Sequence, residues 1–202
     1  MKKILIVLMA LFLQPLSMSA QSYALYGMTN FYSSIFKFDP VTHKSKTVFW
    51  FDTLNGALPV GSLMQASNGL LYGMTSKGGT HNKGVVFSFN PATNKEAVLV
   101  EFNGQNGEYP YGNLIQASNG LLYGMTTQGG TYNNGVIFSY NLSTGSDSVI
   151  FNFDSLVSGS EPWGTLMQAS NGLIYGLTKA GGPIKSEGVL FGFDPANTAS
   201  SF

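Results

Sequence analysis

The sequence predicts an all-β protein built from repeated four-stranded units, and three observations carry this prediction. The segment QASNGLLYGMT at residues 65–75 recurs unchanged at residues 116–126 and with two substitutions at residues 168–178. Short runs of β-branched and aromatic residues alternate with Asn-Gly, Gly-Gly and Asx-Pro turn signals. Glycine accounts for 25 of the 202 residues, whereas only 10% of the residues are charged. A repeat of about 50 residues is typical of solenoids, propellers and arrays.

Composition excludes several classes of protein. Ordinary globular chains contain roughly 25% charged residues, and this chain combines its low charge with 44% apolar and 13% aromatic residues. A disordered polar chain would lack that apolar content. The chain has no cysteine and no arginine, which excludes a disulfide-stapled or cysteine-ligated zinc domain and argues against a nucleic-acid partner.

Each complete unit contains four predicted strands separated by turn residues. Asn68-Gly69 predicts a two-residue type I′ hairpin between the first two strands. Asn90-Pro91 predicts a turn in which the asparagine side chain caps the backbone. In the second unit the expected strands are residues 61–66, 70–75, 85–89 and 97–102.

The third strand of each unit, such as VVF at residues 85–87, is apolar on both faces. An isolated sheet would expose one of these faces, so each unit must be covered on both sides. Four-stranded antiparallel sheets stacked face to face in a ring form a β-propeller. A β-propeller of blades of about 50 residues is therefore the fold class that we expect.

The two terminal units are shorter than the others. The first unit begins at its second strand, and the last unit stops where its fourth strand should begin. We therefore expect about 3.5 blades of a truncated, longer ring. The expected units cover approximately residues 21–53, 59–103, 110–154 and 162–202.

The first twenty residues have the pattern of a signal peptide, which would leave residues 21–202 as the mature repeat domain. Lys2 and Lys3 precede an apolar run at residues 4–13, and small residues follow up to Ala20. This apolar run is too short to span a bilayer, and we expect no transmembrane segment in the mature chain. The sequence thus predicts an exported protein, either extracellular or at the cell surface.

The repeated unit reads P-x-G-x-L-x-Q-A-S-N-G-x-x-Y-G-x-T-x-x-G-G, followed by G-V-x-F and an Asx turn. This unit resembles the GloVer repeat of bacterial surface proteins, some of which are called choice-of-anchor proteins. The resemblance extends from residue 23 to about residue 194. It implies an exported bacterial protein with no general enzymatic activity, which would serve as a non-catalytic binding or structural module.

Candidate ligand-binding residues are expected at the end of the sheets where the longer connections lie, because binding residues concentrate on loops held by a rigid scaffold. At that end, the positions that differ between repeats are of most interest. The ligand we expect there is an extracellular glycan or protein, and the alternative is that the aromatic residues pack between blades. The candidates are Tyr109, Tyr111, Trp163, His81 and Tyr132.

Catalysis has one candidate pair in the sequence. Glu108 and Glu161 are the carboxylates nearest to the arrangement that a glycosidase needs, but they also read as solvated loop charges. The alternative function is therefore a carbohydrate-active hydrolase or lyase, with its site on the long-loop face or in missing blades.

No cofactor and no transition metal are expected, because the chain lacks cysteine and any H-x-x-x-H spacing. Calcium could be held by oxygen ligands of Asp52, Asn103 and Asp154, which follow the fourth strands. The alternative is that these side chains cap turns.

Overall fold

The computed structural model describes residues 24–183 and 187–197. Within these residues the regular elements are all β-strands, so the predicted all-β class is confirmed. The expected signal peptide at residues 1–20 lies outside the described residues, as do residues 198–202 at the end of the last unit.

The strands form four antiparallel sheets in chain order, which we call units 1 to 4. Unit 1 contains β1 (Leu25–Thr29), β2 (Ser34–Asp39) and β3 (Lys44–Trp50). Unit 2 contains β4 (Ala57–Gln65), β5 (Leu71–Lys77), β6 (Val85–Asn90) and β7 (Lys95–Glu101). Unit 3 contains β8 (Glu108–Pro110), β9 (Ile115–Gln116), β10 (Leu122–Gln128), β11 (Val136–Asn141) and β12 (Ser146–Asn152). Unit 4 contains β13 (Ser160–Pro162), β14 (Met167–Gln168), β15 (Ile174–Ala180) and β16 (Leu190–Phe193).

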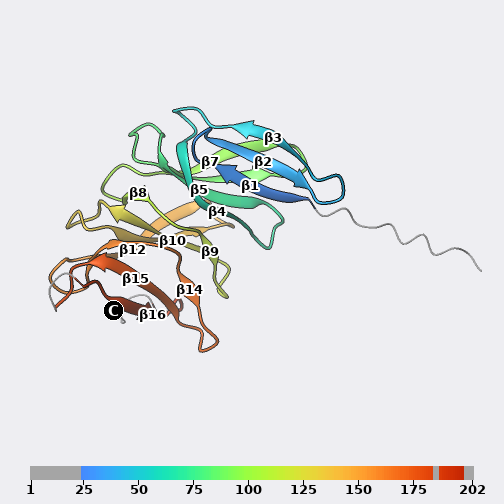
Figure 1. The fold of residues 1–202 in the computed structure, drawn as a ribbon. Helices are drawn as coiled ribbons and strands as arrows, with labels where there is room; N and C mark the ends of the chain where they lie inside the picture. The colour runs from blue at the N-terminus through green and yellow to red at the C-terminus, as the bar shows by residue number, and fades with distance from the viewer. Residues whose placement is uncertain (1–23, 184–186, 198–202) are drawn as a thin grey trace, which may run out of the picture.

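The units follow one another along an arc. Figure 1 shows unit 1 in blue at one end of the molecule and unit 4 in red at the other, with units 2 and 3 between them. Units 2 and 3 therefore each have one face toward the preceding unit and one face toward the following unit. We call these the near face and the far face, and we use the same names for the equivalent surfaces of units 1 and 4.

The innermost strand of units 2, 3 and 4 is irregular, and in unit 2 it differs from its predicted range of residues 61–66. In unit 2 it is β4 (Ala57–Gln65), which begins earlier than expected and shifts register between Val60 and Met64. In units 3 and 4 the corresponding strand is split, into β8 and β9 and into β13 and β14. The interruption includes glycines where neighbouring units touch: a Cβ atom on Gly112 would overlap the carbonyl oxygen of Gly164.

The Asn-Gly hairpins are not of type I′, which corrects the sequence prediction. The Gly69 N–H donates to the Ala66 carbonyl, and the Ala66 N–H donates to the Leu70 carbonyl. Gly69 has a φ of 81°, but Asn68 has no positive φ. This is a three-residue loop, a type I turn followed by glycine in the left-handed region. The Asn68 side chain favours it, because its Oδ1 accepts from the Leu70 N–H at 3.1 Å.

The Asx turns are confirmed. In unit 2, Asn90 Oδ1 accepts hydrogen bonds from the N–H groups of Ala92 at 2.9 Å and Thr93 at 3.3 Å. Asp39 in unit 1 makes the same contacts with Val41 and Thr42. Such side-chain caps satisfy backbone donors that a tight turn leaves without partners.

Cover on both faces of the sheet is confirmed for units 2 and 3. Residues 85–89 of β6 are all buried. The Phe87 ring packs at 4.9 Å against Phe51, between units 1 and 2, while Val86 belongs to a buried cluster with Leu122 of unit 3. Alternate residues of one strand thus supply two different interfaces.

The repeated Gln and Ser residues join neighbouring units. The Gln116 side-chain amide donates to Ser67 Oγ at 3.1 Å, and Gln116 Oε1 accepts from the Ser67 N–H at 2.8 Å. Gln168 makes the same pair of bonds to Ser118. The repeat therefore preserves inter-unit contacts as well as strand cores.

Candidate functional site

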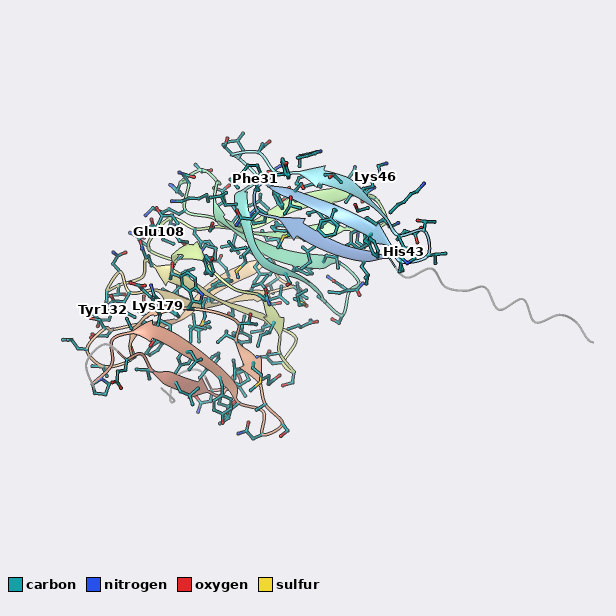
Figure 2. All side chains as sticks on the ribbon, viewed as in Figure 1. Phe31, His43, Lys46, Glu108, Tyr132 and Lys179 are labelled. Carbon is teal, nitrogen blue, oxygen red and sulfur yellow. The ribbon has the colours of Figure 1, made fainter. Side chains whose placement is uncertain are left out.

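The antiparallel strand order separates two kinds of connection. The Asn-Gly and Asx turns lie at one end of the sheets. The loops at residues 78–84 and 129–135, together with the links between units, lie at the other end, which we call the long-loop end. Figure 2 shows Glu108, Tyr132 and Lys179 on one side of the molecule and His43, a short-turn residue, on the opposite side.

Tyr111 and Trp163 are brought together along the inner edge of units 3 and 4, opposite the middle of β10 and β15. They follow β8 and β13, the first strands of units 3 and 4, and their rings stack with centroids 3.9 Å apart and planes inclined by 29°. Tyr111 remains 37% exposed and Trp163 45% exposed. The two rings therefore contact each other between units 3 and 4 and still present aromatic surface to solvent.

The residues two positions before this aromatic pair have an unusual backbone. Tyr109 and Glu161 have φ angles of 53° and 52°, in the left-handed region that non-glycine residues rarely adopt. The Tyr109 N–H donates to the Lys83 carbonyl at 2.9 Å, and the Glu161 N–H donates to the Asn134 carbonyl at 3.1 Å. Both residues are thus anchored to a long loop of the preceding unit.

Two lysines lie against the aromatic rings. Lys77 Nζ stands 3.7 Å from the ring centroid of Tyr109. Lys179 Nζ is 5.5 Å from the Trp163 ring centroid and 2.9 Å from Glu161 Oε2. An ammonium group over an aromatic face is attracted by the ring quadrupole. Charged side chains therefore lie beside the rings of Tyr109 and Trp163.

Glu108 forms an ion pair with Lys83, a residue of the long loop of unit 2. Burial acts to raise the pKa of the Glu108 carboxyl, but hydrogen bonding by Lys83 and Tyr109 and the charges of Lys83 and Lys77 hold it below its usual value. A glycosidase general acid needs a raised pKa at its carboxyl group. The environment of Glu108 therefore favours an ionised carboxylate that pairs with Lys83.

His81 and Tyr132 lie in the outer long loops. His81 is exposed and close enough to Glu101 for its charge to contribute to lowering the pKa of that carboxyl, after the larger effect of hydrogen bonds from Thr80. Tyr132 lines a cavity of about 490 Å³ together with Phe151, Val157 and Leu190. These two candidates therefore have different surroundings from the Tyr111–Trp163 pair.

The three residues considered for calcium act as turn caps. Asp52 Oδ1 accepts from the N–H groups of Leu54 and Asn55, both at 2.8 Å. Asn103 accepts in the same way from Gln105 and Asn106, and Asp154 accepts from Leu156. Among residues 24–183 and 187–197, no three His, Cys, Asp or Glu side chains gather in a group that could hold a metal ion.

Sequence reasoning missed three exposed aromatic residues in unit 1. Phe31 and Tyr32, in the loop between β1 and β2, meet edge to face at 5.1 Å and are both exposed. The exposed Trp50 is the strand partner of Ser34, directly after this loop. The sequence did contain a signal for Trp50. At the same repeat position, units 2 and 3 have the polar residues Glu101 and Asn152, whose side chains accept hydrogen bonds from a long loop.

The described part of the chain contains no helix that is long and apolar enough to cross a membrane.

Solved structures with a similar fold share little sequence with this chain. A chain of the nidogen/laminin complex has a TM-score of 0.63 and 13% identity, covering 89% of this chain and 59% of that one. The extracellular domain of a two-component system from B. thetaiotaomicron has a TM-score of 0.58 and 15% identity, covering 84% of this chain and 19% of that one. TolB from Acinetobacter baumannii has a TM-score of 0.52 and 14% identity, covering 88% of this chain and 40% of that one. The chain thus spans less than two thirds of each, and these likenesses concern the fold alone.

No curated protein matches the chain. The sequence does match a family of repeat proteins over residues 16–202, which includes every described unit. This match agrees with the resemblance carried by the repeated Q-A-S-N-G and Y-G-x-T segments. The chain belongs to the Gloeobacter/Verrucomicrobia repeat family.

Proposed function

We propose that this chain is part of a β-propeller and acts as an exported, non-catalytic binding module that takes a carbohydrate ligand at the Tyr111–Trp163 pair. Support for the ring comes from the four antiparallel sheets packed side by side along an arc. Support for export comes from the signal-peptide pattern at residues 1–20. The B. thetaiotaomicron protein of similar fold is itself an extracellular domain.

The Tyr111–Trp163 pair is the observation that carries the proposed ligand class. A pyranose ring has an apolar face of C–H groups and a rim of hydroxyl groups. The two stacked rings offer an apolar surface, and Lys179 and Glu161 offer a donor and an acceptor beside it. Small-molecule sites commonly combine apolar surface with a few placed polar groups.

The hydrolase alternative has weaker support. Glu108 and Glu161 are each paired with a lysine, Lys83 and Lys179 respectively. A retaining or inverting glycosidase keeps one carboxyl protonated to act on the leaving group, and the lowered pKa of Glu108 opposes that role.

A protein ligand is the second candidate, favoured by the aromatic cluster of unit 1. Phe31 and Tyr32 are exposed in the loop between β1 and β2. Trp50 is exposed at the end of β3, opposite Ser34, which follows that loop. Contiguous exposed aromatic surface is characteristic of protein interaction sites. The nidogen/laminin chain of similar fold is itself described as part of a protein complex.

Titration calorimetry tests the carbohydrate proposal, with soluble neutral and uronic-acid oligosaccharides as probes. We expect Trp163→Ala and Tyr111→Ala each to weaken binding by at least about tenfold, as loss of a stacking contact predicts. Trp50→Ala is the matched control, since it removes an exposed aromatic residue from unit 1. Circular dichroism and thermal unfolding verify that each variant is folded.

Three results would contradict this assignment. Unchanged binding by folded Trp163→Ala would exclude the aromatic pair as the site. Collapse of the fold on Trp163→Ala would identify the tryptophan as part of the core, and the proposed site would be wrong. Binding that Trp50→Ala alone abolishes would move the ligand site to unit 1.

A further inference from the structure

The far face of unit 4 exposes residues whose counterparts in other units are buried. Leu177 and Leu190 are 55% and 69% exposed, whereas Met74 and Val86, at the same repeat positions in unit 2, are 1% and 0% exposed. Met125 and Ile137 of unit 3 are buried in the same way. In units 2 and 3, this face packs against the following unit. The far face of unit 4 is thus an apolar surface of the kind that a further unit covers elsewhere.

The glycines of the innermost strands also show a contact with the following unit that unit 4 lacks among the described residues. A Cβ atom on Gly61 or Gly112 would overlap the backbone of the following unit. A Cβ atom on Gly164, at the same position in unit 4, meets nothing within 4 Å. The close backbone contact between consecutive units therefore stops at unit 4 among the described residues.

The near face of unit 1 is exposed at the opposite end of the arc. Leu25 is 58% exposed, while its counterpart Leu122 in unit 3 is fully buried. Phe36 and Phe38 are only partly buried, although their counterparts in unit 2 are completely buried. Within residues 24–183 and 187–197, no other unit covers the far face of unit 4 or the near face of unit 1 (Figure 1).

The contacts between neighbouring units within the chain show which residues a far face and a near face bring together. Between units 2 and 3, one buried cluster joins Met74 and Val86 of a far face to Leu122 of a near face. Leu177 and Leu190 of unit 4 stand in the positions of the first two residues, and Leu25 of unit 1 stands in the position of the third. Both exposed faces are therefore apolar at the positions that meet in a formed junction.

A polar contact accompanies two of the three junctions. The Tyr26 hydroxyl donates to the Pro91 carbonyl of the next unit at 3.3 Å, and the Tyr123 hydroxyl donates to the Pro195 carbonyl at 3.5 Å. Tyr175 holds the corresponding position on the far face of unit 4, and Pro40 holds the corresponding turn position in unit 1. A junction between units 4 and 1 would thus include a donor and an acceptor in matching places.

We propose that the far face of unit 4 docks the near face of unit 1 from a second copy of this chain. The contact is heterologous, since each copy uses a different surface, and such contacts join molecules head to tail. Burial of Leu177, Leu190 and Leu25 from water drives the association. The Tyr175 hydroxyl donates to the Pro40 carbonyl of the other copy.

Light scattering after size-exclusion chromatography provides the first test. The expected result is that the mass rises from one chain to two or more as concentration increases, because copies associate. Leu190→Asp should raise the concentration required by at least about tenfold, because docking would bury an unpaired carboxylate. Leu54→Asp is the matched control, since it introduces the same charge at another strongly exposed leucine. A one-chain mass at every concentration would overturn the proposal.

Disulfide trapping provides the second test, and the chain suits it because it contains no cysteine. A Leu190→Cys chain is mixed with a Leu25→Cys chain under mild oxidation. Docking of unlike faces predicts that the mixed disulfide exceeds both homodisulfides, whereas Leu54→Cys in place of Leu25→Cys should abolish this excess. Predominance of the homodisulfide between two Leu190→Cys chains would show that like faces meet, and the head-to-tail contact would be wrong.

A third measurement separates a second copy from a further unit in the same polypeptide. If a longer polypeptide from the same gene has a one-chain mass and protects Leu190→Cys from maleimide, a following unit covers the face and the proposal is wrong. Trp163 and Leu190 line one cavity, so Trp163 is left unaltered and no carbohydrate is added in these measurements, which keeps their outcome separate from that of the proposed function.

Discussion

Gln116 of unit 3 holds Ser67 of unit 2 through two hydrogen bonds, one to the Ser67 N–H at 2.8 Å and one to the Ser67 hydroxyl at 3.1 Å. A single side chain therefore ties the Asn-Gly loop of one unit to the first strand of the next. Because Gln168 repeats this contact with Ser118, it belongs to the way in which the units are joined.

Gln116→Ala should destabilise the protein by about 1–2 kcal/mol, since the two hydrogen bonds to Ser67 and the one to the Gly120 carbonyl are lost while the contact remains partly solvated. Urea unfolding followed by tryptophan fluorescence measures the change. Gln105→Ala is the control, because Gln105 lies in an exposed turn between units, where its backbone N–H rather than its side chain donates to Asn103 Oδ1. Equal effects of the two substitutions would show that the contact contributes nothing specific.

Gly112→Ala should destabilise the protein far more than Gly120→Ala. Both glycines have positive φ, at 108° and 83°, so alanine at either position costs about 1–2 kcal/mol of backbone strain. At Gly112 the added methyl group would also overlap the Gly164 carbonyl, whereas at Gly120 nothing lies within 4 Å. Thermal unfolding of the two variants gives the comparison, and equal midpoints would disprove close packing of the inner strands.

Stability should fall as the pH rises from about 4.5 to about 7, because of Glu96. Burial and the nearby charge of Asp52 raise the pKa of the Glu96 carboxyl from 4.5 to about 7, and its Oε1 is buried without a hydrogen-bond partner. Over that range the folded protein retains a proton that the unfolded chain has released, so the free energy of unfolding decreases. Above about pH 7 this contribution levels off.

Glu96→Gln should remove this decrease and stabilise the protein above pH 7 relative to the parent chain. Urea unfolding at several pH values measures both effects. Asp147→Asn is the matched control, since Asp147 occupies the same repeat position in unit 3 and is exposed. If the pH dependence persists in Glu96→Gln, another group is responsible for it.

Polysaccharides should release no new reducing ends in the presence of the protein, because both candidate carboxylates are paired with lysines. A reducing-sugar assay over a broad panel of neutral and acidic polysaccharides measures this outcome. Turnover that Glu161→Gln abolishes, in a variant that remains folded, would replace the binding module with the hydrolase alternative.

The sequence was sufficient to predict features that each unit repeats. The repeated segment at residues 65–75 and the turn beginning at Asn90 predicted the antiparallel strands and the Asx caps. The apolar third strand predicted the cover on both sheet faces that units 2 and 3 show. These features depend on local turn chemistry and on period-two burial, which residues close in the chain specify. The same reasoning erred at Asn68, because Asn-Gly is compatible with more than one hairpin loop.

Tertiary structure alone determined how residues of different units meet. The stacking of Tyr111 on Trp163, the left-handed backbone at Tyr109 and the exposure of Leu190 all depend on the position of a neighbouring unit. Identical repeat positions have different surroundings at the ends of an arc and in its middle, because burial comes from the adjacent sheet. The sequence by itself thus determined what each unit is, and packing between units decided which side chains remain available for a ligand or a second copy.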